Sequence, residues 1–290
     1  MPQEKSFRSE AAVITTGLAM GESPRWHDGK LWVSDWGAQE ILAIDSHGHR
    51  QAMGQTSFEL PVCIDWLPNG CMLIVAGREN RVMRQEADGS LVKYADLRNI
   101  SDEAWNEIVV DGRGNAYING GSGVIALAKK DGSIRQVAGD IAFPNGMTIT
   151  PDNKTLIIAE SYGRKLTAFD IDAGGSLSNR RVWADLGTGV PDGICIDAEQ
   201  AVWYADVPNK WCVRVREGGE VLQKVRVDRG CFACMLGGSD RRTLFIVATE
   251  WRGMDKIVEI ARNRTGQILS IPVPASGAGW AVNFGASGPA

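Results

Sequence analysis

Residues 146–160, GMTITPDNKTLIIAE, contain the pattern that decides the fold: an apolar run, a turn and a second apolar run. The Pro-Asp-Asn in the middle is typical of a tight turn. The flanking runs are rich in the β-branched residues that strands favour. The stretch therefore predicts two antiparallel strands joined by a short turn.

The same arrangement recurs along the whole chain. Six apolar strands, each preceded by a turn, begin at intervals of 41, 44, 40, 46 and 42 residues. They are KLWVSD from Lys30, CMLIVA from Cys71, NAYING from Asn115, TLIIAE from Thr155, AVWYAD from Ala201 and TLFIVA from Thr243. Another apolar run precedes each turn and further runs follow, which makes four strands per repeat. A period of roughly 40–45 residues with four strands is typical of a β-propeller blade.

The repeat predicts an all-β chain: a six-bladed β-propeller with four-stranded antiparallel blades, forming a single domain over residues 1–290. No long helical periodicity competes with it, and residues 98–107, RNISDEAWNE, hold a turn of helix at most. To close the ring, we expect residues 11–16, AAVITT, to add the outer strand to the last blade.

Composition excludes several function classes. The net charge of -4 argues against a general nucleic-acid surface, which would need a basic stripe. No apolar run of about 18 residues is present, so no membrane span is expected, and residues 11–20 are interpreted as mature protein rather than a signal peptide. Most of the six cysteines lie in apolar strand-like runs. They are interpreted as small buried side chains in a reducing compartment, which predicts a cytoplasmic protein.

Polar side chains recur at one phase of the repeat. The strand before each turn should be the innermost strand of its blade, so residues at the same phase should converge at one mouth of the channel. Four oxygen-bearing side chains share this phase, eight to ten residues before the second strand: Glu22, Asn106, Asn145 and Asp192. In the second and sixth repeats the phase is apolar, in LPVC (60–63) and GCFA (230–233).

Two carboxylates and two amides brought together favour a metal site. Buried carboxylates repel each other unless a cation lies between them. An all-oxygen set suits a hard divalent cation such as Ca²⁺, Mg²⁺ or Mn²⁺ better than a structural zinc. Taken singly, FPNG (143–146) and VPDG (190–193) are equally ordinary turn signals between blades.

Other catalytic devices are missing from the sequence. The three histidines, His27, His47 and His49, all lie in the first 50 residues, in turn-like or surface-like positions. The chain has no G-x-S-x-G elbow, no P-loop and no G-x-G-x-x-G. Histidine-based nucleophilic catalysis is therefore not expected, whereas metal-centred hydrolysis needs none of these motifs.

Several longer motifs occur in order and at blade spacing. They are GESPRW (21–26), WNEIVVDGRGNAYI (105–118), FPNGMTITPDNKTLIIAES (143–161), LTAFDIDAGGSLSNRRVWADL (166–186) and VPDGICIDAEQAVWYAD (190–206). Over nearly its whole length the chain resembles the gluconolactonase family, which includes senescence marker protein and luciferin-regenerating enzyme. The resemblance implies a six-bladed propeller with one catalytic divalent metal, often calcium or zinc, that hydrolyses lactones. Some relatives hydrolyse organophosphates.

The resemblance also implies roles for individual residues. Glu22, Asn145 and Asp192 match the family's metal-binding residues, and Asp192 matches its usual candidate for the general base. Asn106 matches the family's pocket asparagine, binding metal or substrate. Its surroundings depart from the family pattern, because Ala104 stands where sugar-lactone enzymes carry an arginine and Glu107 replaces an aspartate. These departures predict a substrate less polar than a sugar lactone.

The predicted rim of the pocket is aromatic. Trp105 and Phe143 flank the polar residues directly and are predicted to contact the substrate. Further apolar side chains at the same phase or after the second strands are Cys63, Phe232, Trp36, Tyr162, Trp211 and Trp251. For each tryptophan, packing between blades is the alternative interpretation.

The sequence thus predicts a divalent-metal-dependent hydrolase that opens a small-molecule lactone. The metal is expected to be Ca²⁺, with Zn²⁺, Mg²⁺ and Mn²⁺ as alternatives, and Asp192 is expected to act as general base. One alternative is phosphotriester or other metal-assisted hydrolysis in the same site. Another is a propeller without enzymatic activity, in which the metal only stabilises a binding platform.

Overall fold

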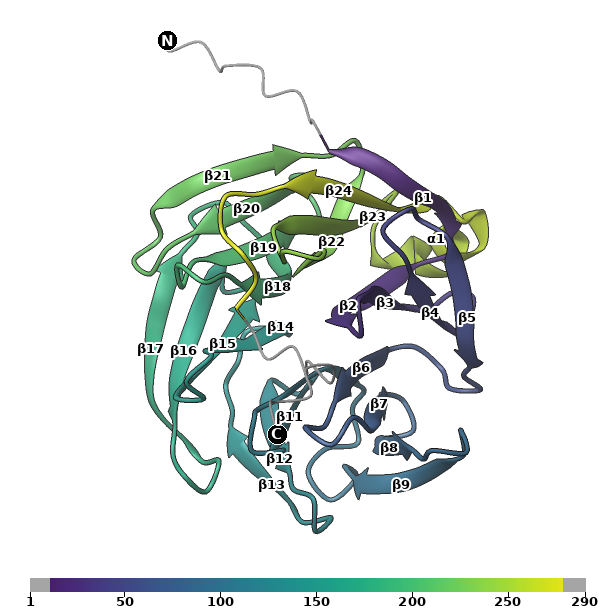
Figure 1. The fold of residues 1–290 in the computed structure, drawn as a ribbon. Helices are drawn as coiled ribbons and strands as arrows, with labels where there is room; N and C mark the ends of the chain where they lie inside the picture. The colour runs from purple at the N-terminus through teal and green to yellow at the C-terminus, as the bar shows by residue number, and fades with distance from the viewer. Residues whose placement is uncertain (1–10, 279–290) are drawn as a thin grey trace, which may run out of the picture.

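The computed structural model describes residues 11–278, which form six four-stranded antiparallel sheets arranged in a ring (Figure 1). The six innermost strands are β2 (Gly21–His27), β6 (Val62–Trp66), β10 (Trp105–Val110), β14 (Pro144–Ile149), β18 (Pro191–Ile196) and β22 (Gly230–Gly237). The second strands are β3 (Lys30–Asp35), β7 (Met72–Ala76), β11 (Ala116–Gly120), β15 (Thr155–Glu160), β19 (Val202–Asp206) and β23 (Thr243–Thr249). The six-bladed propeller predicted from the repeat is confirmed.

The third strand of each blade is still largely buried, and the outermost strand is the most exposed. The third strands are β4 (Glu40–Ile44), β8 (Arg81–Gln85), β12 (Val124–Ala128), β16 (Lys165–Ile171), β20 (Trp211–Val215) and β24 (Gly266–Pro272). The outermost strands are β5 (Arg50–Gln55), β9 (Leu91–Asp96), β13 (Ile134–Ala138), β17 (Leu177–Asp185), β21 (Val221–Arg226) and β1 (Ala12–Leu18). Burial follows this order, since every residue of β7 is buried whereas β5 is almost entirely exposed.

The ring is closed by strands from the two ends of the described chain. Strand β1 pairs antiparallel with β24, from Ala12 opposite Ser270 to Leu18 opposite Gly266. The last blade therefore has the order β1-β24-β23-β22, and its outermost strand comes from the N-terminal side (Figure 1). This is the closure that the AAVITT stretch predicted.

Apolar clusters between neighbouring blades form the core. The cluster around Ile108 and Leu73, for example, joins β10 to β7, and the cluster around Leu31 and Phe245 joins the first blade to the last. Five of the six cysteines are buried, and all six are free thiols. Cys195, Cys212, Cys231 and Cys234 lie together in the cluster between the fifth and sixth blades. Their burial agrees with the interpretation of these residues as small core side chains.

One helical element was not expected from the sequence. The connection between β23 and β24 contains a 3₁₀ turn, η1 (Met254–Lys256), and a short helix, α1 (Ile257–Asn263), of which only Ile260 is buried. Ala261 packs so closely against Gly37 that a Cβ on that glycine would lie 2.8 Å from the Ala261 Cβ. Because α1 follows a second strand, it lies at the end of the ring where the chain enters the innermost strands. No helix within residues 11–278 is long and apolar enough to cross a membrane.

Candidate active site at one mouth of the channel

The four polar residues that share a repeat phase come together in the structure. Glu22, Asn106, Asn145 and Asp192 each lie near the beginning of an innermost strand, on β2, β10, β14 and β18. These strands pack directly against their neighbours around the channel. Glu22 is buried, and the other three side chains are half-buried. The prediction that this phase converges at one mouth is therefore confirmed.

A hydrogen bond links the two amides, and Asn145 lies beside Asp192. The Nδ2 atom of Asn106 lies 3.2 Å from Oδ1 of Asn145 and 3.3 Å from the carbonyl oxygen of Pro144. The Asn145 amide also lies close enough to the carboxylate of Asp192 to lower its pKa. Asn106, Asn145 and Asp192 thus adjoin one another across three consecutive blades.

Two residues that the sequence did not single out hold Asn145 in place. The Ser161 hydroxyl lies 3.4 Å from Nδ2 of Asn145 and donates to the carbonyl oxygen of Pro191 at 2.6 Å, beside Asp192. Asn119, which is fully buried, donates from Nδ2 to the backbone oxygen of Asn145 at 2.6 Å. Ser161 therefore orients the Asn145 amide, while Asn119 fixes its backbone.

β-Bulges occur at this phase in five of the six innermost strands. The ladder between β10 and β11 skips Asn106, because Trp105 pairs with Gly120 and Glu107 with Asn119. Comparable shifts lie in β2 after Glu22, in β14 at Asn145, in β18 at Asp192 and in β22 at Phe232. Strand β6 pairs regularly, so the bulges include all four strands with a polar residue at this phase and, in addition, β22 with Phe232. A bulge changes the direction in which a side chain points. The bulges in β2, β10, β14 and β18 therefore bear on how the four polar residues are directed at the mouth.

Glycines let the bulged strands approach closely. A Cβ on Gly146 would lie 2.5 Å from the backbone nitrogen of Ile194 and 2.6 Å from the backbone carbonyl oxygen of Asp192. A Cβ on Gly193 would lie 2.7 Å from the Ala233 Cα. The Asn-Gly and Asp-Gly pairs of FPNG and VPDG are therefore not turns between blades. They are parts of β14 and β18 that contact neighbouring backbone.

The carboxylates at this mouth raise one another's affinity for protons. The pKa of Glu22 is raised well above its usual value, chiefly by burial and then by the charges of Asp192 and Glu107. The pKa of Asp192 is also raised well above its usual value, by burial and by the charge of Glu107, against the hydrogen bond from Asn145. Negative charge is therefore concentrated at the mouth, which favours a cation there.

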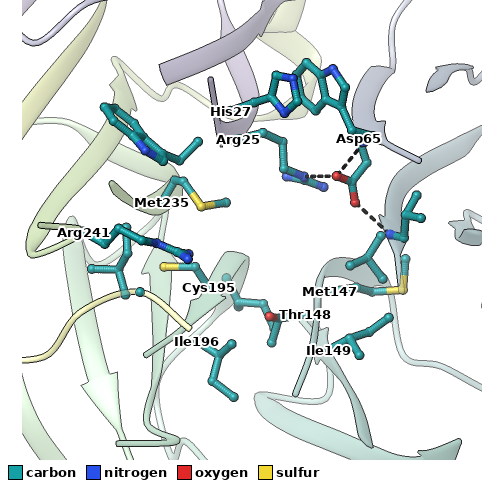
Figure 2. A pocket seen from close by; sticks show the side chains of 17 residues that line it. Arg25, His27, Asp65, Met147, Thr148, Ile149, Cys195, Ile196, Met235 and Arg241 are labelled. Carbon is teal, nitrogen blue, oxygen red and sulfur yellow. Dashed lines mark hydrogen bonds and ion pairs between the residues drawn. The ribbon is translucent and has the colours of Figure 1, made fainter. Parts of the chain in front are cut away.

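Glu107 belongs to a buried ionic network that runs down the channel. Its Oε1 accepts hydrogen bonds from Arg25 at 3.0 Å and from Ser23 at 3.3 Å. Arg25 also lies 3.7 Å from the carboxylate of Asp65, whose other oxygen accepts the Val110 N–H at 2.7 Å (Figure 2). Burial raises the pKa of Asp65 to about 6. The guanidinium of Arg25 thus pairs with both carboxylates below the mouth and offsets one of their two negative charges.

A pocket lies further along the same innermost strands. Arg25, Asp65, Met147, Cys195 and Met235 line it together with residues near them (Figure 2). Each of these side chains lies at least two positions beyond the residue at the predicted phase in its own strand. The pocket therefore lies deeper in the channel and contains none of the four residues that converge at the mouth.

The aromatic residues differ in exposure. Phe143 and Tyr162 are 40% and 72% exposed, and their rings stack with centroids 4.4 Å apart. Phe143 adopts a φ of +60°, an unusual conformation for a bulky residue. Strained backbone of this kind is concentrated at functional sites. Because both rings are exposed and stacked, Phe143 and Tyr162 form an aromatic surface on the segment next to Asn145.

Most of the other predicted rim residues are packed rather than exposed. The Trp105 side chain is completely buried in the core between the second and third blades, contrary to the expected place at the rim. Trp36 donates to the Val62 carbonyl, Trp251 packs edge-to-face on Phe232, and Trp211 lies beneath Lys224 and Arg226. Cys63 is buried, and its Sγ lies 2.6 Å from the carbonyl oxygen of Asn106. The tryptophans thus follow the packing interpretation.

The donor set fits a hard cation through its oxygens. Within residues 11–278, no group of three or more His, Cys, Asp or Glu side chains is arranged to hold a metal ion. A site at this mouth would therefore depend on amide oxygens as well as on the two carboxylates. Carboxylate and amide oxygens are the ligands that Ca²⁺ takes in proteins, with water completing its coordination.

Comparison with known proteins agrees with the fold. A family model described as "SMP-30/Gluconolactonase/LRE-like region" matches residues 20–250. Regucalcin from Xenopus laevis is 26% identical over 281 residues, covering 89% of this chain and 92% of regucalcin. Pentonolactonase XacC from Haloferax volcanii is 25% identical over 222 residues, covering 73% of this chain and 72% of the relative. A solved luciferin-regenerating enzyme superposes with a TM-score of 0.79 at 18% identity, covering 94% and 98% of the two chains.

Fold and site together define a six-bladed propeller with an oxygen-lined channel mouth. Since the family model spans most of the sequence, the chain belongs to the SMP-30/gluconolactonase/LRE-like family.

Proposed function

We propose that this protein is a divalent-metal-dependent hydrolase that opens lactones. The observation that carries the proposal is the convergence of Glu22, Asn106, Asn145 and Asp192 at one channel mouth, on strands that bulge at that phase. Membership of the SMP-30/gluconolactonase/LRE-like family and the similarity to a named pentonolactonase support lactones as the substrate class.

The charge balance at the mouth supports a bound cation. Among the described residues, no ion pair joins Glu22 or Asp192 to a lysine, arginine or histidine side chain; the guanidinium of Arg25 is paired with Glu107 and Asp65. A buried carboxylate next to a half-buried one costs free energy or holds a proton unless a cation is present. A divalent cation would offset both charges.

Glu22, Asn145 and Asp192 would hold this cation, with Asn106 beside them. Calcium suits the set best, because all four side chains offer oxygen, and Mg²⁺, Mn²⁺ or Zn²⁺ are alternatives. A bound divalent cation supplies Lewis-acid polarisation of a carbonyl oxygen and a lowered pKa of water.

The chain's own residues supply the acid–base chemistry. The ionised carboxylate of Asp192 takes a proton from the water that attacks the lactone carbonyl. The ring C–O bond then breaks, and the departing oxygen takes up a proton, so the product is a hydroxy acid. Asn145 lies beside Asp192 and favours its ionised form. The Nδ2 of Asn106 donates to Oδ1 of Asn145 and to the carbonyl oxygen of Pro144, which holds the Asn145 amide in place.

The rim favours a lactone with an apolar portion. Phe143 and Tyr162 expose a stacked aromatic surface beside Asn145, whereas Ala104 provides no charged group at the position where sugar-lactone relatives carry arginine. A ring or alkyl substituent would bury apolar area against this pair. Trp105 has no part in this contact, because its side chain is buried.

A substrate panel tests the proposal. Calcium-loaded protein is assayed by pH-stat against alkyl-substituted lactones, aryl-substituted lactones, sugar lactones and phosphotriesters. Ring opening of lactones is expected, with the highest kcat/KM for the substituted apolar ones. Turnover of phosphotriesters alone would favour the alternative hydrolysis, and no turnover of any ester in metal-loaded protein would favour a binding platform; either result overturns the lactonase proposal.

A further inference from the structure

Three buried carboxylates mark the blades that carry the proposed metal ligands. The second strands of the first, fourth and fifth blades end in Asp35, Glu160 and Asp206. Their exposed fractions are only 2%, 1% and 2%. Because second strands run antiparallel to the innermost strands, these carboxylates lie at the same end of the ring as the proposed ligands.

Each carboxylate accepts backbone N–H groups from the chain that leads into a ligand. The two oxygens of Asp35 accept the N–H groups of Ala19 and Met20 at 3.0 and 2.7 Å, just before Glu22. In the fourth blade, Oε2 of Glu160 accepts the Ala142 N–H at 2.9 Å. Ala142 lies three residues before Asn145.

The fifth blade repeats this arrangement. Oδ2 of Asp206 accepts the Val190 N–H at 3.2 Å, two residues before Asp192. Charge-assisted hydrogen bonds to backbone are stronger than neutral ones, so these four contacts restrain the three segments that lead into the ligands.

The remaining three blades lack a carboxylate at this position. Their second strands end in Ala76, Gly120 and Thr249. The innermost strands of these blades carry Cys63, Asn106 and Phe232 at the predicted phase. An anchoring carboxylate is therefore present in the blades of Glu22, Asn145 and Asp192 and is missing from the blade of Asn106.

We propose that Asp35, Glu160 and Asp206 are positioning residues that set the affinity of the channel mouth for a divalent cation. The inference rests on the proposed function. A cation site needs its ligands held to within about 0.5 Å. Replacing residues that orient ligands typically weakens metal binding by roughly 10–100-fold. Each anchor acts on the backbone two to three residues before a ligand, which transmits its restraint to the side chain.

Asp111 offers a matched control. It is 1% exposed and accepts two backbone N–H groups, from Arg113 and Asn115, at 2.9 and 2.8 Å. It resembles Asp35 in burial and bonding, but it follows the far end of β10 rather than preceding a ligand. Loss of Asp111 should therefore affect stability without affecting the mouth.

The test is calorimetric titration of the metal-free full chain with CaCl₂, for wild type and for Asp35→Asn, Asp206→Asn and Asp111→Asn. We expect Kd to rise about tenfold or more in the first two variants and to stay within about threefold of wild type in Asp111→Asn. The melting temperature without metal should fall in all three. If Asp35→Asn does not fold, Glu160→Gln replaces it.

Unchanged calcium affinity in the anchor variants, or an equal loss in Asp111→Asn, would overturn the positioning role while leaving the proposed function intact. A wild-type protein that binds no divalent cation would overturn the proposed function, and this inference with it.

Discussion

The side-chain nitrogen of Asn106 lies 3.2 Å from the side-chain oxygen of Asn145, although the two residues belong to different blades and are 39 positions apart. With Nδ2 of Asn145 directed to Ser161, both polar atoms of the Asn145 amide are oriented by neighbours. Asn106 acts as the donor in this pair. The relationship favours different roles for the two amides: Asn145 presents an oxygen at the mouth, and the Nδ2 of Asn106, which also donates to the carbonyl oxygen of Pro144, holds that oxygen in place.

Replacing Asp192 by asparagine should remove hydrolysis but not the fold. Loss of a general base lowers kcat by about 10²–10⁴-fold. The control is Asp197→Asn, just beyond the other end of β18, where the carboxylate is fully buried and bonds Arg214 at 2.7 Å. That variant should lose stability and keep its rate per folded molecule. Steady-state kinetics and thermal melts separate the two, and an active Asp192→Asn protein would refute the assignment.

The stability of the metal-free protein should depend on pH in a defined direction. Glu22 and Asp192 have folded-state pKa values raised above their usual values of 4.5 and 3.8. Their contribution to stability is therefore fully present below about pH 4 and is lost as pH rises through the raised values. Since a cation binds the ionised carboxylates, the increase in Tm caused by calcium should grow with pH.

Melts in EDTA and in CaCl₂ across pH 4–8 measure this difference. Asp65, with a pKa of about 6, also loses its contribution to the stability of the fold over this pH range. This loss is the same in EDTA and in CaCl₂, so it cancels in the difference between the two melting temperatures. A Glu22→Gln variant should show a smaller, flatter response to calcium. A calcium effect on Tm that does not vary with pH in wild type would speak against the carboxylate site.

Gly146→Ala should destabilise the protein and disturb the site. The added Cβ would lie 2.5–2.6 Å from backbone atoms of β18 at Asp192 and Ile194. Overpacking of this kind typically costs about 1–3 kcal/mol in the free energy of unfolding. Gly54→Ala on the exposed strand β5 is the control, since nothing lies within 4 Å of its Cβ position. Urea unfolding gives the comparison; equal stability of the two variants would contradict the close approach of β14 and β18.

Phe143→Ala should alter substrate preference more than chemistry. An aromatic contact contributes about 0.5–1.5 kcal/mol, which corresponds to roughly a 2–13-fold rise in KM for an aryl-substituted lactone at unchanged kcat. An unsubstituted lactone should be affected little. Val182→Ala, which removes an exposed apolar side chain from the outer strand β17, is the control. Equal KM effects on both substrates would remove Phe143 from the substrate contact.

The repeat made the fold and the converging residues predictable. A propeller blade has a fixed strand order, so residues at one phase, such as Glu22 and Asp192, had to meet at one mouth. The bulges were not predictable, because a register shift depends on how two strands pair rather than on either sequence alone. The anchoring contacts of Asp35 and Glu160 were missed for a similar reason: they are made to backbone N–H groups, which carry no sequence signal.

The expectation that Trp105 lies at the rim was wrong, and the geometry of a strand already argued against it. Neighbouring residues in a strand point to opposite faces, so a tryptophan next to Asn106 was to be expected in the core. Phe143 escapes this rule because it precedes β14 and has a positive φ. Helix α1 was not recognisable because seven residues hold too few turns for a clear apolar period.

The central claim, that a divalent cation at the mouth is required for lactone hydrolysis, is tested most directly by removing and restoring the metal. The protein is treated with EDTA, desalted, shown by elemental analysis to be metal-free, and assayed before and after addition of CaCl₂. We predict that hydrolysis falls to background in the metal-free protein and returns with calcium, while Asp192→Asn stays inactive in both. Full activity in protein proven to contain no metal would contradict the account.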